Sequence, residues 1–113
     1  MVFVDETTYQ QLAGKTFRAI DDALASVDPD VVEVTFAGDV LTLAFANGLR
    51  CIVNTQRPVQ QIWLAAKDSA WHFSWDAARG AWLDDKGRGV ELHAQLEAII
   101  RQQTGQEVPI PAG

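Results

Sequence analysis

The chain has 113 residues, which indicates one domain with a modest core that needs neither a disulfide nor a structural metal. Its residues are 48% hydrophobic and 21% charged, as in ordinary soluble globular domains. The net charge of −6 argues against binding to nucleic acid or to anionic membrane surfaces, and it favours cations or a basic protein partner.

The lone cysteine, Cys51, excludes an internal disulfide and a cysteine-ligated zinc or iron–sulfur site within one chain. No apolar run reaches the length of a membrane span. The first residues, Met1 to Asp5, show neither a basic region followed by a long apolar one nor an Arg- and Ser-rich transit peptide. We therefore expect a protein of the bacterial cytoplasm.

The first periodic segment predicts a helix over about residues 7–27, with Thr7 or Thr8 as its N-cap and with Asp28-Pro29 ending it. Its apolar residues recur at spacings of three or four, and they are Tyr9, Ala13, Phe17, Ile20, Leu24 and Val27.

Alternating apolar and polar residues then predict antiparallel strands over about residues 31–84, with tight turns at Gly38-Asp39 and Asn47-Gly48. A further turn is expected at Arg57-Pro58, and Cys51 and Val53 are expected to face inward. The other strand residues predicted to be buried are Val32, Val34, Phe36, Leu41, Leu43, Phe45, Ile62, Leu64 and Phe73.

A second helix is predicted over about residues 90–103, followed by Gly105 as a C-terminal cap and by an extended tail over 106–113. Val108 or Ile110 in this tail is expected to pack across the helices. The chain thus predicts one α+β domain spanning residues 1–113, a two-layer sandwich in which both helices cover one face of a five- to six-stranded antiparallel sheet. The opposite face is expected to be open to water.

Alternation along the strand that holds Trp63 places Gln61, Trp63 and Ala65 on one face and Ile62 and Leu64 on the other. If Ile62 and Leu64 are buried, an indole and several amides stand on the open face, where such groups serve recognition and not bond-making. The predicted partner-binding residues are Asn54, Gln56, Gln61, Trp63 and His72. Trp82 is a candidate extension of this patch, and coverage of the indole by a terminal segment is the alternative.

Acidic residues are concentrated in the first 39 residues, and they are Asp5, Glu6, Asp21, Asp22, Asp28, Asp30, Glu33 and Asp39. Carboxylates on an exposed edge bind hard cations weakly, through oxygens and retained waters. The alternative is an ordinary solvated helix face, with an ion pair between Arg18 and Asp22.

Residues suited to catalysis are sparse. His72 and His93 have no partner at metal-ligand spacing, and Cys51 is expected to be buried filler. A Ser-His-Asp arrangement, a Gly-rich phosphate loop and a metalloprotease motif are all missing from the sequence. We therefore do not expect an enzyme.

The segment Asn54-x-Gln56-x-Pro58-x-x-Gln61-Ile62-Trp63-Leu64-Ala65 resembles the signature of the frataxin family. Flanking pieces resemble it too, in matching order over about residues 12–105, and they include Leu41 to Gly48, His72-Phe73, Trp82 and Val90 to Leu96. Without a targeting leader, the chain is most similar to the bacterial branch, called CyaY.

The resemblance implies two helices on one face of an antiparallel sheet and weak binding of ferrous or ferric iron. The implied iron ligands are Asp21, Asp22, Asp28, Asp30 and Glu33. It also implies docking on the cysteine desulfurase of iron–sulfur cluster assembly, and in some cases on the scaffold protein, through the sheet face around Trp63. The expected state is a monomer, with iron-dependent oligomers left open. The alternatives are a ferroxidase that stores iron and a metal-independent interaction module.

Three residues depart from the pattern of the family, because Ala25, Ser26 and Thr35 stand where bacterial relatives often carry acids. Lys15 and Arg18 dilute the negative charge further. We therefore expect weaker iron binding than in the family at large, or a shift of the site to the corner formed by Asp28, Asp30 and Glu33.

Overall fold

The computed structural model describes residues 4–111. Its elements, in chain order, are α1 (Glu6–Leu24), β1 (Val32–Ala37), β2 (Val40–Phe45), β3 (Arg50–Gln56), the short 3-10 helix η1 (Arg57–Val59), β4 (Gln61–Ala66), β5 (Ser69–Asp76), β6 (Ala81–Asp84) and α2 (Leu92–Thr104).

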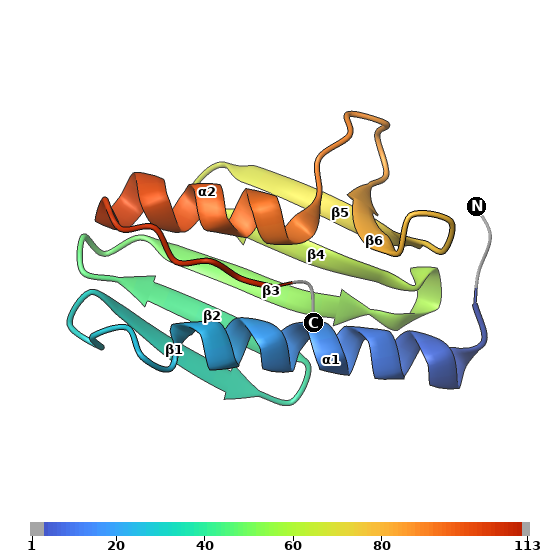
Figure 1. Cartoon of the computed structure of the whole chain (residues 1–113), viewed down its shortest axis with the longest axis horizontal. Coiled ribbons are helices and arrows are strands. Elements are labelled where there is room, and N and C mark those ends of the chain that lie inside the picture. Colours follow the sequence, from blue (N-terminus) through green and yellow to red (C-terminus); the bar gives the residue numbers. More distant parts are fainter. Residues whose placement is uncertain (1–3, 112–113) are drawn as a thin grey trace.

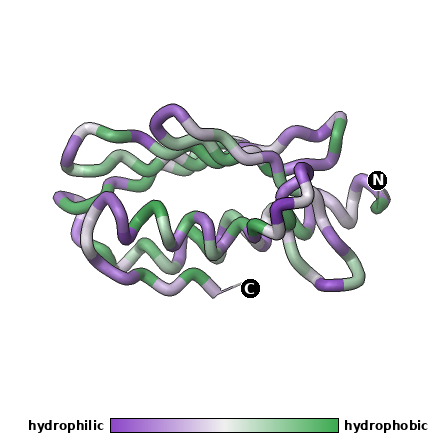
Figure 2. Tube along the Cα trace, turned by 90° about the horizontal axis from the view of Figure 1, so that it is seen from above, coloured by the Kyte–Doolittle hydropathy of each residue, from purple (hydrophilic) through white to green (hydrophobic). Residues whose placement is uncertain are grey.

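The strands form one six-stranded sheet in the order β1-β2-β3-β4-β5-β6, and each strand pairs antiparallel with its neighbour in the chain. Both helices lie on the same face of this sheet, and the C-terminal segment runs between them (Figure 1). In the view from above, the sheet forms one layer and the helices with the C-terminal segment form the other (Figure 2). The predicted two-layer α+β architecture is therefore confirmed, and the second face of the sheet is left without a helix.

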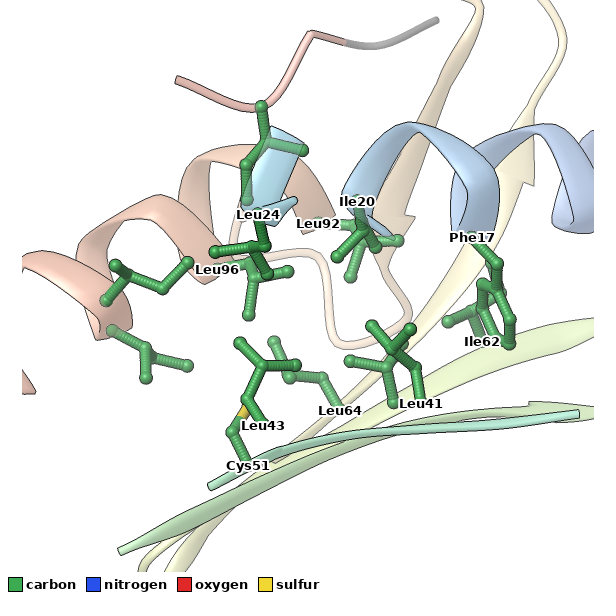
Figure 3. Packing of buried hydrophobic residues seen from close by; sticks show 14 of the residues in the cluster. Phe17, Ile20, Leu24, Leu41, Leu43, Cys51, Ile62, Leu64, Leu92 and Leu96 are labelled. Carbon is green, nitrogen blue, oxygen red and sulfur yellow. The ribbon is translucent and has the colours of Figure 1, made fainter. Parts of the chain in front are cut away.

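The core lies between the two layers. Phe17, Ile20, Leu24, Leu92 and Leu96 from the helices meet Leu41, Leu43, Cys51, Ile62 and Leu64 from the strands (Figure 3). In the tail, Val108 and Ile110 are both buried, as predicted, and the Ile110 amide donates a hydrogen bond to Oε2 of Glu97 over 2.8 Å. Burial of Ile62 and Leu64 decides the orientation of β4, because neighbouring side chains of a strand point to opposite faces.

Two predicted core residues are not fully buried. Phe36 is 41% exposed, although its ring still meets the edge of Phe17 at a centroid distance of 5.6 Å. Val34, on the same strand, is only half-buried. Both lie on β1, which has a strand on one side only, so the helix layer covers them incompletely. The alternation of β1 was predicted correctly, but the side chains of an edge strand need not be buried.

The helix ends also differ from the prediction. Asp5 caps α1, because its Oδ1 accepts the Thr8 amide over 3.0 Å, so neither threonine is the cap. The helix ends at Leu24, before the predicted end near residue 27, and the next residues form turns. Helix α2 starts at Leu92, because the Glu91 side chain caps it by accepting the backbone amides of His93 and Ala94. At its other end, Gly105 takes the predicted left-handed cap conformation with φ of 74°.

Between residues 4 and 111, neither helix combines the length and the apolar character that crossing a bilayer requires.

Candidate functional site

The open face of the sheet carries Trp63, which is half-buried and lies directly opposite Asn54 on β3 and His72 on β5. Gln61 and Gln56 form the next pair of this face, and Gln61 also lies opposite Ser74. The predicted partner-binding residues are thus brought together on the side of the sheet that faces away from the helices. We call Asn54, Gln56, Gln61, Trp63 and His72 the Trp63 patch.

Aromatic stacking and hydrogen bonds hold the indole of Trp63. Its ring stacks on the imidazole of His72 with centroids 4.1 Å apart and planes inclined by 14°. Its Nε1–H donates to Oε1 of Gln61 over 2.8 Å. The Gln61 amide nitrogen in turn donates to Oδ2 of Asp85 over 3.0 Å and to Oγ of Ser74 over 3.2 Å. A side chain held in this way loses little conformational entropy when a partner binds.

Gln61 differs from the expectation of an exposed amide, because only 4% of the residue is accessible. Its carboxamide is engaged on both ends by Trp63, Ser74 and Asp85. Buried amides of this kind normally need all their partners. Gln61 therefore orients the indole instead of offering its own amide to a partner.

The sequence reasoning missed Asp85 and assigned no role to Ser74. The alternation along β5 does place Ser74 on the same face as His72, and the structure confirms that placement. Asp85 follows β6 and reaches the patch because its backbone amide donates to the carbonyl of His72 over 2.9 Å. Its Oδ2 also lies 3.8 Å from Nδ1 of His72. No local pattern in a Gly- and Asp-rich loop predicts that position.

Asn54 and Gln56 are half-buried on β3. The Asn54 side chain donates to the carbonyl of Thr55 over 3.2 Å. Two exposed apolar side chains, Val40 and Ile52, continue the same face toward β2. Val40 lies directly opposite Asn54. Ile52 points to the open face because its neighbour Val53 is buried on the core face. The open face therefore combines apolar area with amide groups, as protein interfaces do.

Trp82 does not extend the Trp63 patch, and that expectation was wrong. It lies on the helix side of β6, is 1% exposed, and donates from Nε1 to Oγ1 of Thr16 over 2.9 Å. Its ring also meets Tyr9 and Trp75 edge-on. The indole is a core group that ties α1 to the last strand.

The predicted acidic residues lie along α1 and the start of β1. Half-buried Asp21 and exposed Glu33 line one hollow of about 240 Å³, together with Val34 and Pro29. Asp22, Asp28 and Asp30 are exposed, and Oδ1 of Asp28 accepts the Asp30 amide over 2.9 Å. Of the five predicted iron ligands, Asp21 and Glu33 therefore line one hollow, and Asp22, Asp28 and Asp30 are not among its lining residues.

Within residues 4–111, no group of three or more His, Cys, Asp or Glu side chains is arranged to hold a metal ion. The expected ion pair between Arg18 and Asp22 is also not among the ion pairs of the described residues. The acids are separate carboxylates, exposed except for half-buried Asp21. Such groups suit weak cation binding with retained waters better than a closed metal centre.

The other candidate groups are structural. Cys51 is fully buried, and burial raises the pKa of its thiol to about 12, which makes it inert filler as predicted. His93 is buried on α2, with Nδ1 2.6 Å from Oε2 of Glu91. Burial by itself would raise the pKa of the Glu91 carboxyl. Hydrogen bonds from His93 and Ala94 outweigh burial and hold that pKa below its ordinary value.

Comparison with known proteins agrees with this geometry. A family model described as a frataxin-like domain matches residues 2–106. An iron-sulfur cluster assembly protein CyaY from Paraburkholderia phymatum is 38% identical over 107 residues, which cover 95% of this chain and 98% of the relative. Another of the same name from Delftia acidovorans is 47% identical over 88 residues, which cover 78% of this chain and 73% of that protein. The solved frataxin of Psychromonas ingrahamii superposes with a TM-score of 0.85 at 29% identity, covering 96% of this chain and 99% of that one.

Proposed function

The chain belongs to the frataxin-like family, and on that premise we propose that it is an iron-binding regulator or adaptor of iron–sulfur cluster assembly. Its relatives carry the name of iron-sulfur cluster assembly proteins, which supports the pathway. The relatives named above come from bacteria, in keeping with the expectation of a bacterial protein. The bacterial cytoplasm stays our prediction for its compartment.

The observation that carries the proposal is the Trp63 patch. An aromatic side chain on an open sheet face, stacked on His72 and hydrogen-bonded to Gln61, is a preorganised anchor for another protein. The apolar side chains of Val40 and Ile52 enlarge the surface that a partner would cover. We propose that the cysteine desulfurase docks here, with the scaffold protein as a further partner.

In this proposal iron is cargo of the protein and not a resident cofactor. Asp21 and Glu33 share a hollow, so two carboxylates and retained waters would hold ferrous iron there at low affinity. Asp22, Asp28 and Asp30 would add negative potential around that hollow. The missing acids at Ala25, Ser26 and Thr35 fit a weak site and not a storage site.

Two alternatives make different demands on the protein. A ferroxidase needs a preorganised metal centre, whereas the described acids are separate and mostly exposed. A metal-independent interaction module would need only the Trp63 patch. We propose no catalytic role, and we expect iron oxidation to be no faster with the protein than in buffer.

Reconstituted cluster assembly tests the proposal. The desulfurase and the scaffold would be mixed with ferrous iron and cysteine, and cluster formation would be followed by absorbance with and without the protein. We expect the wild type to change the rate and Trp63→Ala to lose the effect, while the open-face control Thr42→Ala retains it. A wild type without any effect on the rate, at concentrations above that of the desulfurase, would contradict the regulatory role.

A further inference from the structure

The two edge strands of the sheet, β6 and β1, differ in whether their outer backbone groups are paired. Along β6, an isolated bridge pairs Leu83 with Glu91, and the Asp84 amide donates to the carbonyl of Val90 over 2.9 Å. The segment before α2 thus covers this edge. At the other edge, β1 pairs with β2 alone. Open edges are templates for strand addition unless something protects them.

The hydrogen-bond pattern shows which backbone groups of β1 point outward. The Ala46 amide donates to the carbonyl of Val31 over 3.1 Å, so these two residues form a hydrogen-bonded pair. In an antiparallel ladder such pairs alternate, so the amides of Glu33 and Thr35 also point toward β2. The amides and carbonyls of Val34 and Phe36 then point to the free edge.

One further contact agrees with this assignment of outward-pointing groups. Val32 lies two residues before Val34, so its amide points the same way, and it donates to the carbonyl of Asp28 over 3.2 Å, on the side away from β2. The turn before β1 therefore accepts the hydrogen bond of the first outward-pointing amide. In the described chain, no hydrogen bond from a side chain or from outside the ladder reaches the amides of Val34 and Phe36.

The side chains along this edge offer two kinds of contact. Phe36 is 41% exposed and presents an aromatic ring at the end of β1. Beside Val34 lies the hollow of about 240 Å³ that Asp21 and Glu33 line. An added strand would place one side chain near the ring and another near the hollow that Asp21 and Glu33 line, about two residues apart along the strand.

Charge decides the occupant. Asp21 and Glu33 line the hollow beside the edge, and exposed Asp22 follows Asp21 in the chain. No ion pair of residues 4–111 includes any of the three. A second copy of this chain would bring the same carboxylates against themselves, which disfavours pairing of β1 with β1. We propose that the free edge of β1 binds an extended, basic segment of a partner protein as an additional strand, with a Lys or Arg side chain reaching the hollow.

This edge is separate from the Trp63 patch, because β2 lies between β1 and β3, the nearest strand of the patch. The inference therefore does not depend on docking at the indole. The two surfaces can also be disabled one at a time.

A blocked hexapeptide of alternating Lys and Val is the probe, and the same peptide with Glu in place of Lys is its control. Amide hydrogen exchange of the uniformly ¹⁵N-labelled protein is the readout. We expect the basic peptide at about 1 mM to slow exchange at Val34 and Phe36 at least fivefold and to leave Glu33 and Thr35 unchanged, since their amides already pair with β2. The acidic peptide should slow neither.

Variants sharpen the test. Phe36→Pro removes one outward donor and should abolish the effect, while Phe36→Ala keeps the donor and should retain part of it. Asp21→Lys with Glu33→Lys should weaken peptide binding about tenfold or more, and Trp63→Ala should leave it unchanged. Unchanged exchange at Val34 and Phe36 in the wild type overturns the proposal. Slower exchange that is lost in Trp63→Ala also overturns it. So does slower exchange that depends on the protein concentration and not on the peptide, because that result identifies a second copy of the chain as the occupant.

Discussion

The indole of Trp63 and the imidazole of His72 lie 4.1 Å apart and nearly parallel on neighbouring strands of the open sheet face. They form a cross-strand pair in the register of β4 and β5, so the backbone sets their contact. Stacking covers one side of the indole and leaves the half-exposed ring in one orientation. The anchor residue that we propose is thus held in one orientation without a partner.

Asp85→Ala tests how that orientation is maintained. The substitution removes the carboxylate that accepts the Gln61 amide over 3.0 Å, leaving that nitrogen only Oγ of Ser74. We expect the Trp63 indole N–H resonance to shift and broaden in NMR spectra, while the buried Trp82 indole signal stays in place. Asp68→Ala, on an exposed turn, is the control. An unchanged Trp63 signal in Asp85→Ala would show that the stack with His72 suffices.

The two faces of the sheet predict different costs for the same substitution. Ile62 is fully buried beneath the helices, so Ile62→Ala should lower the free energy of unfolding by about 2–5 kcal/mol. Ile52 is 39% exposed on the open face, so Ile52→Ala should cost about 1 kcal/mol or less. Urea denaturation measures both. Equal costs would contradict the assignment of the faces.

Asp84 makes the stability of the protein depend on acidity. It is buried, and the Arg88 guanidinium donates to its two oxygens over 2.9 Å each, which holds the pKa of the Asp84 carboxyl well below its ordinary value. The unfolded chain therefore takes up this proton first as the pH falls. The stabilisation is complete above the unfolded pKa of about 4 and is lost progressively as the pH falls below it toward the folded pKa.

Asp84→Asn should accordingly be less stable than the wild type at pH 7 and should lose less stability between about pH 5 and pH 2. Thermal unfolding over that range gives the comparison. Asp68→Asn, which changes the charge by the same amount on an exposed turn, should follow the wild-type curve. If Asp84→Asn also runs parallel to the wild type, the ion pair is not the source of the acid sensitivity.

Ferrous or manganous ions should broaden selected amide signals. We expect the amides of Asp21 and Glu33 to broaden first, because both residues line one hollow, and the signals of Asp28 and Asp30 to follow. Asp21→Asn with Glu33→Gln should remove the selectivity, and Asp68→Asn should not. Uniform broadening along the chain would favour the metal-independent module.

Periodicity alone predicted most of the fold, because the buried faces of β2, β4 and α1 repeat at regular spacing. It failed at Phe36, where alternation was right but the strand lies at the sheet edge, a property of topology and not of local pattern. It failed again at Trp82, since a short last strand does not reveal which of its faces meets α1.

The placement of the candidate site residues was predicted in part. Trp63 and His72 share a face because both lie on regular strands, and the register brings them together as expected. Burial of Gln61 was not foreseen, because it depends on Asp85, which arrives from a loop after β6. Gln61 and Asp85 are 24 positions apart, and Asp85 lies in an irregular loop, so no repeating pattern in the sequence predicts their contact.

The central claim is that a partner docks on the open sheet face, and the most direct measurement is the affinity of the cysteine desulfurase for three forms of the protein. Isothermal titration should give a measurable Kd for the wild type and for Thr42→Ala on the same face. Trp63→Ala should bind about 30-fold more weakly, equivalent to about 2 kcal/mol for the loss of an aromatic anchor. Equal affinity of Trp63→Ala and the wild type, with both variants folded, would contradict the account.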